Sequence, residues 1–92
     1  VSNEPGYYEP GSFGIRIENL IYAKESQHTN GFIEFVNLTL VPYSKALIDM
    51  KLLSDSEISY LRDYYNQIST QVLPKLSISA QVWLKTEIDT FN

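Results

Sequence analysis

The chain has 92 residues, 43% hydrophobic and 20% charged, which fits one small domain with a single core. Its net charge of -4 and the lack of a basic stripe argue against nucleic acid or an anionic membrane surface as a partner. With no cysteine, the chain can form no disulfide framework, thiolate nucleophile or zinc knuckle, which fits a reducing compartment. No apolar run approaches the length of a membrane span, and no signal-peptide pattern opens the chain. We therefore expect a cytoplasmic setting.

The first half of the chain has the pattern of strands joined by turns. Residues 5–14 are rich in Pro and Gly, which predicts turns between short extended pieces. Residues 13–18 then alternate, with apolar side chains at the odd positions and Gly14, Arg16 and Glu18 at the even positions. A period of two predicts a strand with two chemically different faces, and Arg16 and Glu18 share one of them.

A second extended segment follows a polar turn. Residues 23–31 are polar and end in Asn30-Gly31, the strongest short turn signal in the chain. Residues 32–41 are rich in β-branched and aromatic side chains, which favours a strand, and Pro42 closes it.

The second half has the pattern of helices. Ser54 and Glu57 have the spacing of a capping box, which predicts a helix start at Ser54. Pro74 lacks an N–H and should end or kink this helix. The apolar residues of the helix recur at a spacing of three and four and predict one buried stripe: Ile58, Leu61, Tyr65, Ile68 and Val72.

A second helix is predicted to begin at Ser79. Ile78 and Trp83 have the spacing of a hydrophobic staple around that start. Leu84, Ile88 and Phe91 continue its buried side. Both helices are interpreted as structural scaffold.

Two carboxylates are the candidates for chemistry. Glu4 and Glu18 each lie in an extended segment flanked by Gly or Pro, where a backbone can approach a ligand closely. Arg16 lies on the same strand face as Glu18, and a guanidinium keeps a neighbouring carboxylate ionised and oriented. Oriented carboxylates suit a hard divalent cation. The alternative interpretation is a salt bridge on a strand surface, which is common and contributes little.

The sequence around these acids resembles a known enzyme family. The stretch Glu4-Pro-Gly-Tyr-Tyr-Glu-Pro-Gly-Ser-Phe-Gly-Ile-Arg-Ile-Glu-Asn19 is similar to the end of the catalytic domain of Xaa-Pro aminopeptidases, the aminopeptidase P family. That family shows E-P-G-x-Y followed by G-I-R-I-E-[ND]. Phe35-Val-Asn-Leu-Thr-Leu-Val-Pro42 and Leu47-Ile-Asp49 resemble its F-E-x-L-T-L-V-P and L-I-D segments. The helical remainder also fits in length and pattern.

The resemblance implies an α+β fold, the C-terminal part of a pita-bread metallopeptidase domain. Residues 1–43 would be its last antiparallel strands, and residues 44–92 a helical C-terminal extension. The implied enzyme hydrolyses the bond between an N-terminal residue and a following proline. Members are often homodimers, and the upstream part of the same enzyme would be a partner of these residues.

The resemblance also implies a site. The family holds two divalent metal ions, usually Mn²⁺, with two Asp, one His and two Glu. Glu4 matches the first Glu, which is also a candidate general base, and Glu18 matches the Glu that bridges both metals. Arg16 matches an Arg near the bridging carboxylate, and Tyr8 is a candidate pocket residue.

The chain departs from the family pattern in two respects. The family's two Asp and its metal-binding His precede the motif that begins at Glu4, so three of five ligands are not matched. His28 falls in the predicted turn and receives no ligand role. Val36 stands where the family has Glu, which leaves the role of that position open.

Two hypotheses follow. In the first, the chain is part of a metallopeptidase, and the 92 residues alone are inactive for lack of ligands. In the second, it is a non-catalytic binding or structural module that keeps the metallopeptidase-like fold, with exposed strand edges available to another chain.

Overall fold

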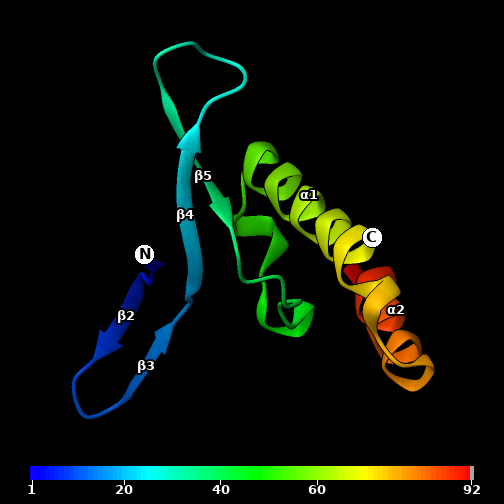
Figure 1. Cartoon of the computed structure of the whole chain (residues 1–92). Helices are drawn as coiled ribbons and strands as arrows, with labels where there is room; N and C mark the ends of the chain where they lie inside the picture. The colour runs from blue at the N-terminus through cyan, green and yellow to red at the C-terminus, as the bar shows by residue number, and fades with distance from the viewer. Residues whose placement is uncertain (92) are drawn as a thin grey trace. The chain divides into compact units, whose positions relative to one another are not determined.

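A computed structural model describes residues 1–91. The chain divides into two compact units, one comprising Val1–Thr39 and the other beginning at Leu40. Antiparallel strands form the first unit and helices the second, so the α+β order predicted from the sequence is confirmed (Figure 1).

The first unit consists of antiparallel ribbons. Strand β4 lies between β1 and β5 in one sheet, and β2 pairs with β3 in another. The strands are β1 (Ser2–Asn3), β2 (Gly6–Glu9), β3 (Phe13–Arg16), β4 (Asn19–Glu25) and β5 (Ile33–Asn37).

A tight turn joins β2 to β3. Ser12 N donates to Glu9 O at 3.0 Å, and Gly11 has φ +72°. Pro10 followed by a Gly of positive φ is the pattern of a type II turn, since Pro fixes the first central φ and Gly accepts the second. This turn sets the register of β2 against β3, which pairs Glu9 with Phe13.

The second hairpin differs from its sequence prediction at both ends. Strand β4 continues to Glu25, into the predicted polar turn, and β5 ends at Asn37, short of the predicted end at residue 41. Lys24 Nζ lies 3.1 Å from Glu34 Oε1 across the two strands and lowers the pKa of that carboxyl. Cross-strand charge pairs of this kind let polar residues extend a ladder that composition alone assigns to a loop.

The second unit begins with two short 3-10 turns and continues with two α-helices. The 3-10 turns are η1 (Lys45–Leu47) and η2 (Met50–Leu52), and a third, η3 (Leu73–Lys75), connects the helices. Helix α1 spans Asp55–Gln71 and α2 spans Ile78–Phe91. Pro74 lies in the connecting turn, so its predicted effect on α1 is confirmed.

The predicted capping box at the start of α1 is confirmed. Glu57 N donates to Ser54 Oγ at 3.3 Å, and Ser54 N donates to Glu57 Oε2 at 2.8 Å. Two backbone donors that the helix leaves unpaired are thereby satisfied. The bond from the backbone of Ser54 is also the main cause that lowers the pKa of Glu57.

Substituting Ser54→Ala is expected to lower the free energy of unfolding at pH 7 by about 1 kcal/mol. The loss should shrink in acid. Because the pKa of Glu57 is lowered on folding, its contribution is present above its unfolded pKa and disappears as the pH falls through its folded pKa. Urea unfolding of the 92-residue chain, followed by helical circular dichroism at pH 7 and pH 3, measures both effects. An equal loss at the two pH values would contradict the role of Glu57.

The predicted staple at the start of α2 is wrong. Ile78 is 83% exposed and Trp83 is 56% exposed, so they do not pack around a cap. The helix starts earlier because Ser77 precedes its first turn: Gln81 N donates to Ser77 O at 2.9 Å, and Ala80 N to Ser77 Oγ at 3.5 Å.

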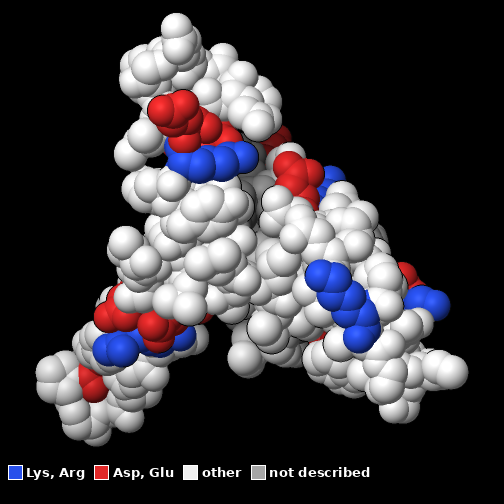
Figure 2. All heavy atoms as spheres, viewed as in Figure 1, with Lys and Arg blue, Asp and Glu red and all other residues white. Residues whose placement is uncertain are grey.

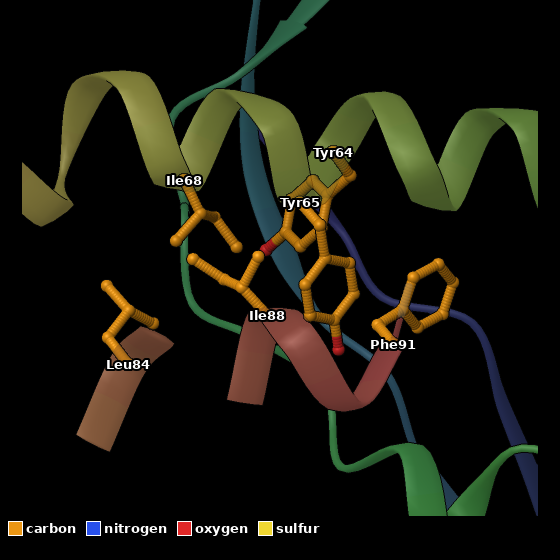
Figure 3. Close-up of a cluster of buried hydrophobic side chains, with 6 residues drawn as sticks. All are labelled: Tyr64, Tyr65, Ile68, Leu84, Ile88 and Phe91. Carbon is orange, nitrogen blue, oxygen red and sulfur yellow. The ribbon is translucent and has the colours of Figure 1, made fainter. Parts of the chain in front are cut away.

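The core of the second unit lies between the two helices. Figure 3 shows side chains from α1 and α2 directed toward one another, and the rings of Tyr65 and Phe91 stack with centroids 4.3 Å apart. The buried residues are Tyr64, Tyr65, Ile68, Leu84, Ile88 and Phe91. The predicted positions on α2 are therefore confirmed. On α1, Tyr65 and Ile68 are buried as predicted and Tyr64 is an unpredicted member of the core. The other predicted members are only partly buried: Ile58, Leu61 and Val72.

Tyr64 is buried because its hydroxyl finds a backbone partner. It donates to Val41 O at 2.8 Å and accepts from Val41 N at 3.1 Å. Tyr65 donates to Tyr43 O, and burial raises the pKa of its phenol. The adjacent tyrosines thus hold the extended segment after Leu40 against α1, while their rings fill the core. Within residues 1–91, no helix has the length and apolar character that crossing a membrane requires.

Candidate metal centre

Glu4 lies in the short gap between β1 and β2, and Glu18 lies in the gap between β3 and β4, so the register of the flanking ladders sets them opposite each other. The pairing of β1 with β4 sets Asn3 against Asn19, and the pairing of β2 with β3 sets Gly6 against Arg16. Between these two ladders the register does not change, since Ile17 N donates to Pro5 O at 3.1 Å. The residues between the ladders therefore form two opposed pairs, Pro5 with Ile17 and Glu4 with Glu18.

The hydrogen-bond pattern shows which kind of pair this is. Val1 and Ile21 exchange two backbone bonds, of 3.1 and 2.8 Å, and are a hydrogen-bonded pair. In an antiparallel ladder such pairs alternate with non-hydrogen-bonded pairs, whose Cα atoms are only about 4.5 Å apart. Counted along this register, Glu4 and Glu18 fall on a non-hydrogen-bonded position, where opposed side chains share one face and close spacing is expected.

Two carboxylates at this spacing repel each other. Like charges directly opposite one another destabilise a strand pair. A divalent cation between them would turn this repulsion into attraction, and carboxylate oxygens are the ligands that Mn²⁺ and Mg²⁺ prefer. The donor chemistry of the pair therefore fits a hard cation.

Arg16 lies two residues before Glu18, on the same face, and pairs with Gly6. Its Nε donates to the hydroxyl of Tyr8 at 2.9 Å, and its guanidinium carbon is 6.0 Å from the centre of the Tyr8 ring. The bond to Tyr8 is the main cause that raises the pKa of Arg16, and the negative charges of Glu4 and Glu18 raise it further. The guanidinium thus stays charged within the field of both carboxylates.

Two glycines make room for the Tyr8 ring. A Cβ atom at Gly6 would lie 2.5 Å from Tyr8 Oη, and one at Gly14 would lie 2.6 Å from Tyr8 Cδ1. Both distances are too short for real carbon contacts. The ring therefore lies across both strands on the face of the two carboxylates, where the absence of side chains at Gly6 and Gly14 allows it to meet Arg16.

The salt-bridge interpretation is not what the structure shows. Among residues 1–91 the one ion pair is that of Lys24 with Glu34, and Arg16 bonds to Tyr8 instead of Glu18. Figure 2 shows acidic and basic side chains side by side on the strand region. Glu4 and Glu18 act on Arg16 through space, and neither carboxylate forms an ion pair within residues 1–91.

The remaining candidates lie elsewhere. His28 lies in the exposed loop after β4, where its backbone N donates to Ser26 Oγ at 3.2 Å. Val36 pairs with Tyr22 on the second hairpin. The described part of the chain brings no three His, Cys, Asp or Glu side chains together as a metal-binding group. This chain thus supplies two carboxylates of a candidate site.

Sequence reasoning missed one polar neighbour of the pair. Ser2 Oγ donates to Glu4 Oε2 at 2.9 Å. The signal was present, since Ser2 is two residues before Glu4 and side chains two apart on a strand share a face.

Comparisons with known proteins show the family to which the chain belongs. The chain matches the family described as the C-terminal region of peptidase M24 over residues 31–91, and it therefore belongs to that family. It is 44% identical over 95 residues to Xaa-Pro aminopeptidase 1 of Dictyostelium discoideum, and 42% identical over 90 residues to aminopeptidase P2 of Arabidopsis thaliana. These alignments cover 96% and 91% of the chain.

The relatives are much longer than this chain. It spans 15% of the Dictyostelium protein and 13% of the Arabidopsis protein. A probable Xaa-Pro aminopeptidase P of Pyrenophora teres f. teres, 40% identical over 95 residues, is covered to 14%. The resemblance to the C-terminal end of aminopeptidase P is thereby confirmed.

Proposed function

We propose that the whole protein containing this chain is a metal-dependent Xaa-Pro aminopeptidase, and that Glu4 and Glu18 are two of its metal ligands. The observation that carries the proposal is the register of the flanking ladders, which opposes the two carboxylates, while neither forms an ion pair within residues 1–91. The names of the relatives supply the reaction. A pita-bread arrangement of the complete catalytic domain is part of this proposal.

In this proposal, Glu4, Glu18 and Arg16 have different roles. Glu18 would hold two divalent ions, for which Mn²⁺ is proposed, and Glu4 would hold one of them. Glu4 would also act as general base, accepting a proton from the attacking water. Arg16, held by Tyr8, would keep positive charge beside both carboxylates and orient them. The ions, when bound, would polarise the scissile carbonyl and acidify water.

The proposed substrate class is peptides with proline at the second position. Proline has no N–H and a fixed ring, so a site that grips the second residue through its backbone N–H cannot hold it. A dedicated pocket is needed, and this chain contributes at most part of it.

An exposed apolar face supports a role for the rest of the protein. On the side of the β2–β3 hairpin opposite the carboxylates, the apolar side chains of Tyr7, Phe13, Ile15 and Ile17 are each more than half exposed. Exposed patches of this kind mark interaction surfaces. We propose that upstream residues of the same enzyme cover this face.

Two further properties belong to the proposal. The complete enzyme would be a cytoplasmic homodimer, and the 92 residues alone would be inactive.

The test is an assay of the full-length protein on matched dipeptides. Cleavage of Xaa-Pro but not of Xaa-Ala is expected, with loss of activity after chelation and recovery with Mn²⁺. Equal cleavage of both dipeptides would contradict the substrate class, and chelator-resistant cleavage would contradict the metal. No cleavage of either, in a folded Mn²⁺-loaded protein, would favour the alternative of a non-catalytic binding module.

A further inference from the structure

The carboxylate of Glu4 has two different neighbours along its strand face. On one side lies Ser2, whose hydroxyl donates to Oε2 at 2.9 Å. On the other side lies Gly6, which has no side chain and leaves space that the Tyr8 ring enters. Among the described residues, Ser2 therefore supplies the hydrogen bond that restrains the Glu4 side chain.

The pairing of β1 with β4 fixes the position of this hydroxyl. Ser2 pairs with Leu20 in the same register that opposes Glu4 to Glu18. Because side chains two apart on a strand share a face, the hydroxyl lies beside the carboxylate pair, on the side away from Arg16. The hydrogen bond from Ser2 occupies Oε2 of Glu4 and limits the rotation of the carboxylate. Oε1 is then the oxygen available to a ligand.

We propose that Ser2 is a positioning residue for Glu4: its hydroxyl holds Oε2, so that the carboxylate is pre-oriented to offer Oε1 to a divalent cation. This inference rests on the proposed function of Glu4 as a metal ligand. Outer-sphere hydrogen bonds to ligating groups orient them, and their removal typically costs about 10–100-fold in metal affinity or activity. Ser2 touches neither the cation nor the substrate in this account.

The experiment is a calorimetric titration of Mn²⁺ into the metal-free full-length protein. Ser2→Ala is expected to weaken Mn²⁺ binding by about 10–100-fold. Ser2→Thr keeps the hydroxyl and is expected to restore most of the affinity. Ser12→Ala removes a hydroxyl at the exposed hairpin turn and should leave the affinity unchanged. The thermal midpoint of the metal-free protein should be the same for all variants, since Ser2 is exposed.

Two outcomes would overturn the inference: parental Mn²⁺ affinity in Ser2→Ala, or equal weakening in the Ala and Thr variants. A Glu4→Gln variant in the same series separates this failure from that of the proposed function. If Glu4→Gln loses affinity and Ser2→Ala does not, Glu4 remains a ligand and only the role of Ser2 is wrong. If Glu4→Gln binds Mn²⁺ as tightly as the parent, Glu4 is not a ligand and both proposals fail.

Discussion

Replacing Glu18 by alanine in the full-length protein is expected to reduce kcat/KM for Xaa-Pro cleavage by at least about 100-fold, beyond the usual loss for an outer-sphere partner. The reason is geometric. The register of the flanking ladders sets Glu18 opposite Glu4, so its removal takes away the second carboxylate that a cation between them would need. Assays at increasing Mn²⁺ measure whether excess metal compensates.

The matched control is Glu25→Ala. Glu25 is an exposed Glu on the same strand ribbon, in β4, and its loss should leave kcat/KM near the parental value. Circular dichroism of both variants establishes that the strands and helices persist. Parental activity in a folded Glu18→Ala variant would remove Glu18 from the site.

The second large effect is expected in the helical core. Ile68→Ala should lower the free energy of unfolding by about 2–5 kcal/mol, because Ile68 is fully buried, with 0% exposure, between α1 and α2. The lower stability has two causes: the hydrophobic burial of the removed carbon atoms is lost, and a cavity is left in their place. Urea unfolding of the 92-residue chain, followed by helical circular dichroism, measures it.

Ile78 provides the control for this substitution. It is the same residue type and is 83% exposed at the first turn of α2, so Ile78→Ala should change stability by no more than about 0.5 kcal/mol. Equal losses in the two variants would mean that the core does not lie between the helices.

The helical unit shows what sequence patterns can and cannot predict. The capping box at Ser54 was predictable because its two bonds are local and depend on a spacing of three residues. The start of α2 was not, since Ser77 and Ser79 both suit a cap, and in the structure the first bonds of the helix go to Ser77. Tyr64 was missed for a related reason: its burial depends on hydrogen bonds with Val41, far away in sequence.

In the candidate site, too, local features could be predicted from the sequence and tertiary contacts could not. Alternation along residues 13–18 placed Arg16 and Glu18 on one face, and that part needs no tertiary information. The opposition of Glu4 to Glu18 depends on register, which the Pro10-Gly11 turn fixes and a shift of one residue would destroy. The contact of Arg16 with Tyr8 was equally hidden, because it requires a ring to cross positions where only glycine fits.

The most direct test of the central claim is to locate the metal itself. Crystals of the full-length protein soaked with Mn²⁺ would be measured at the manganese edge, so that anomalous peaks mark the ions. Manganese peaks beside the carboxylates of both Glu4 and Glu18 are expected. Manganese peaks that contact neither Glu4 nor Glu18 would contradict it.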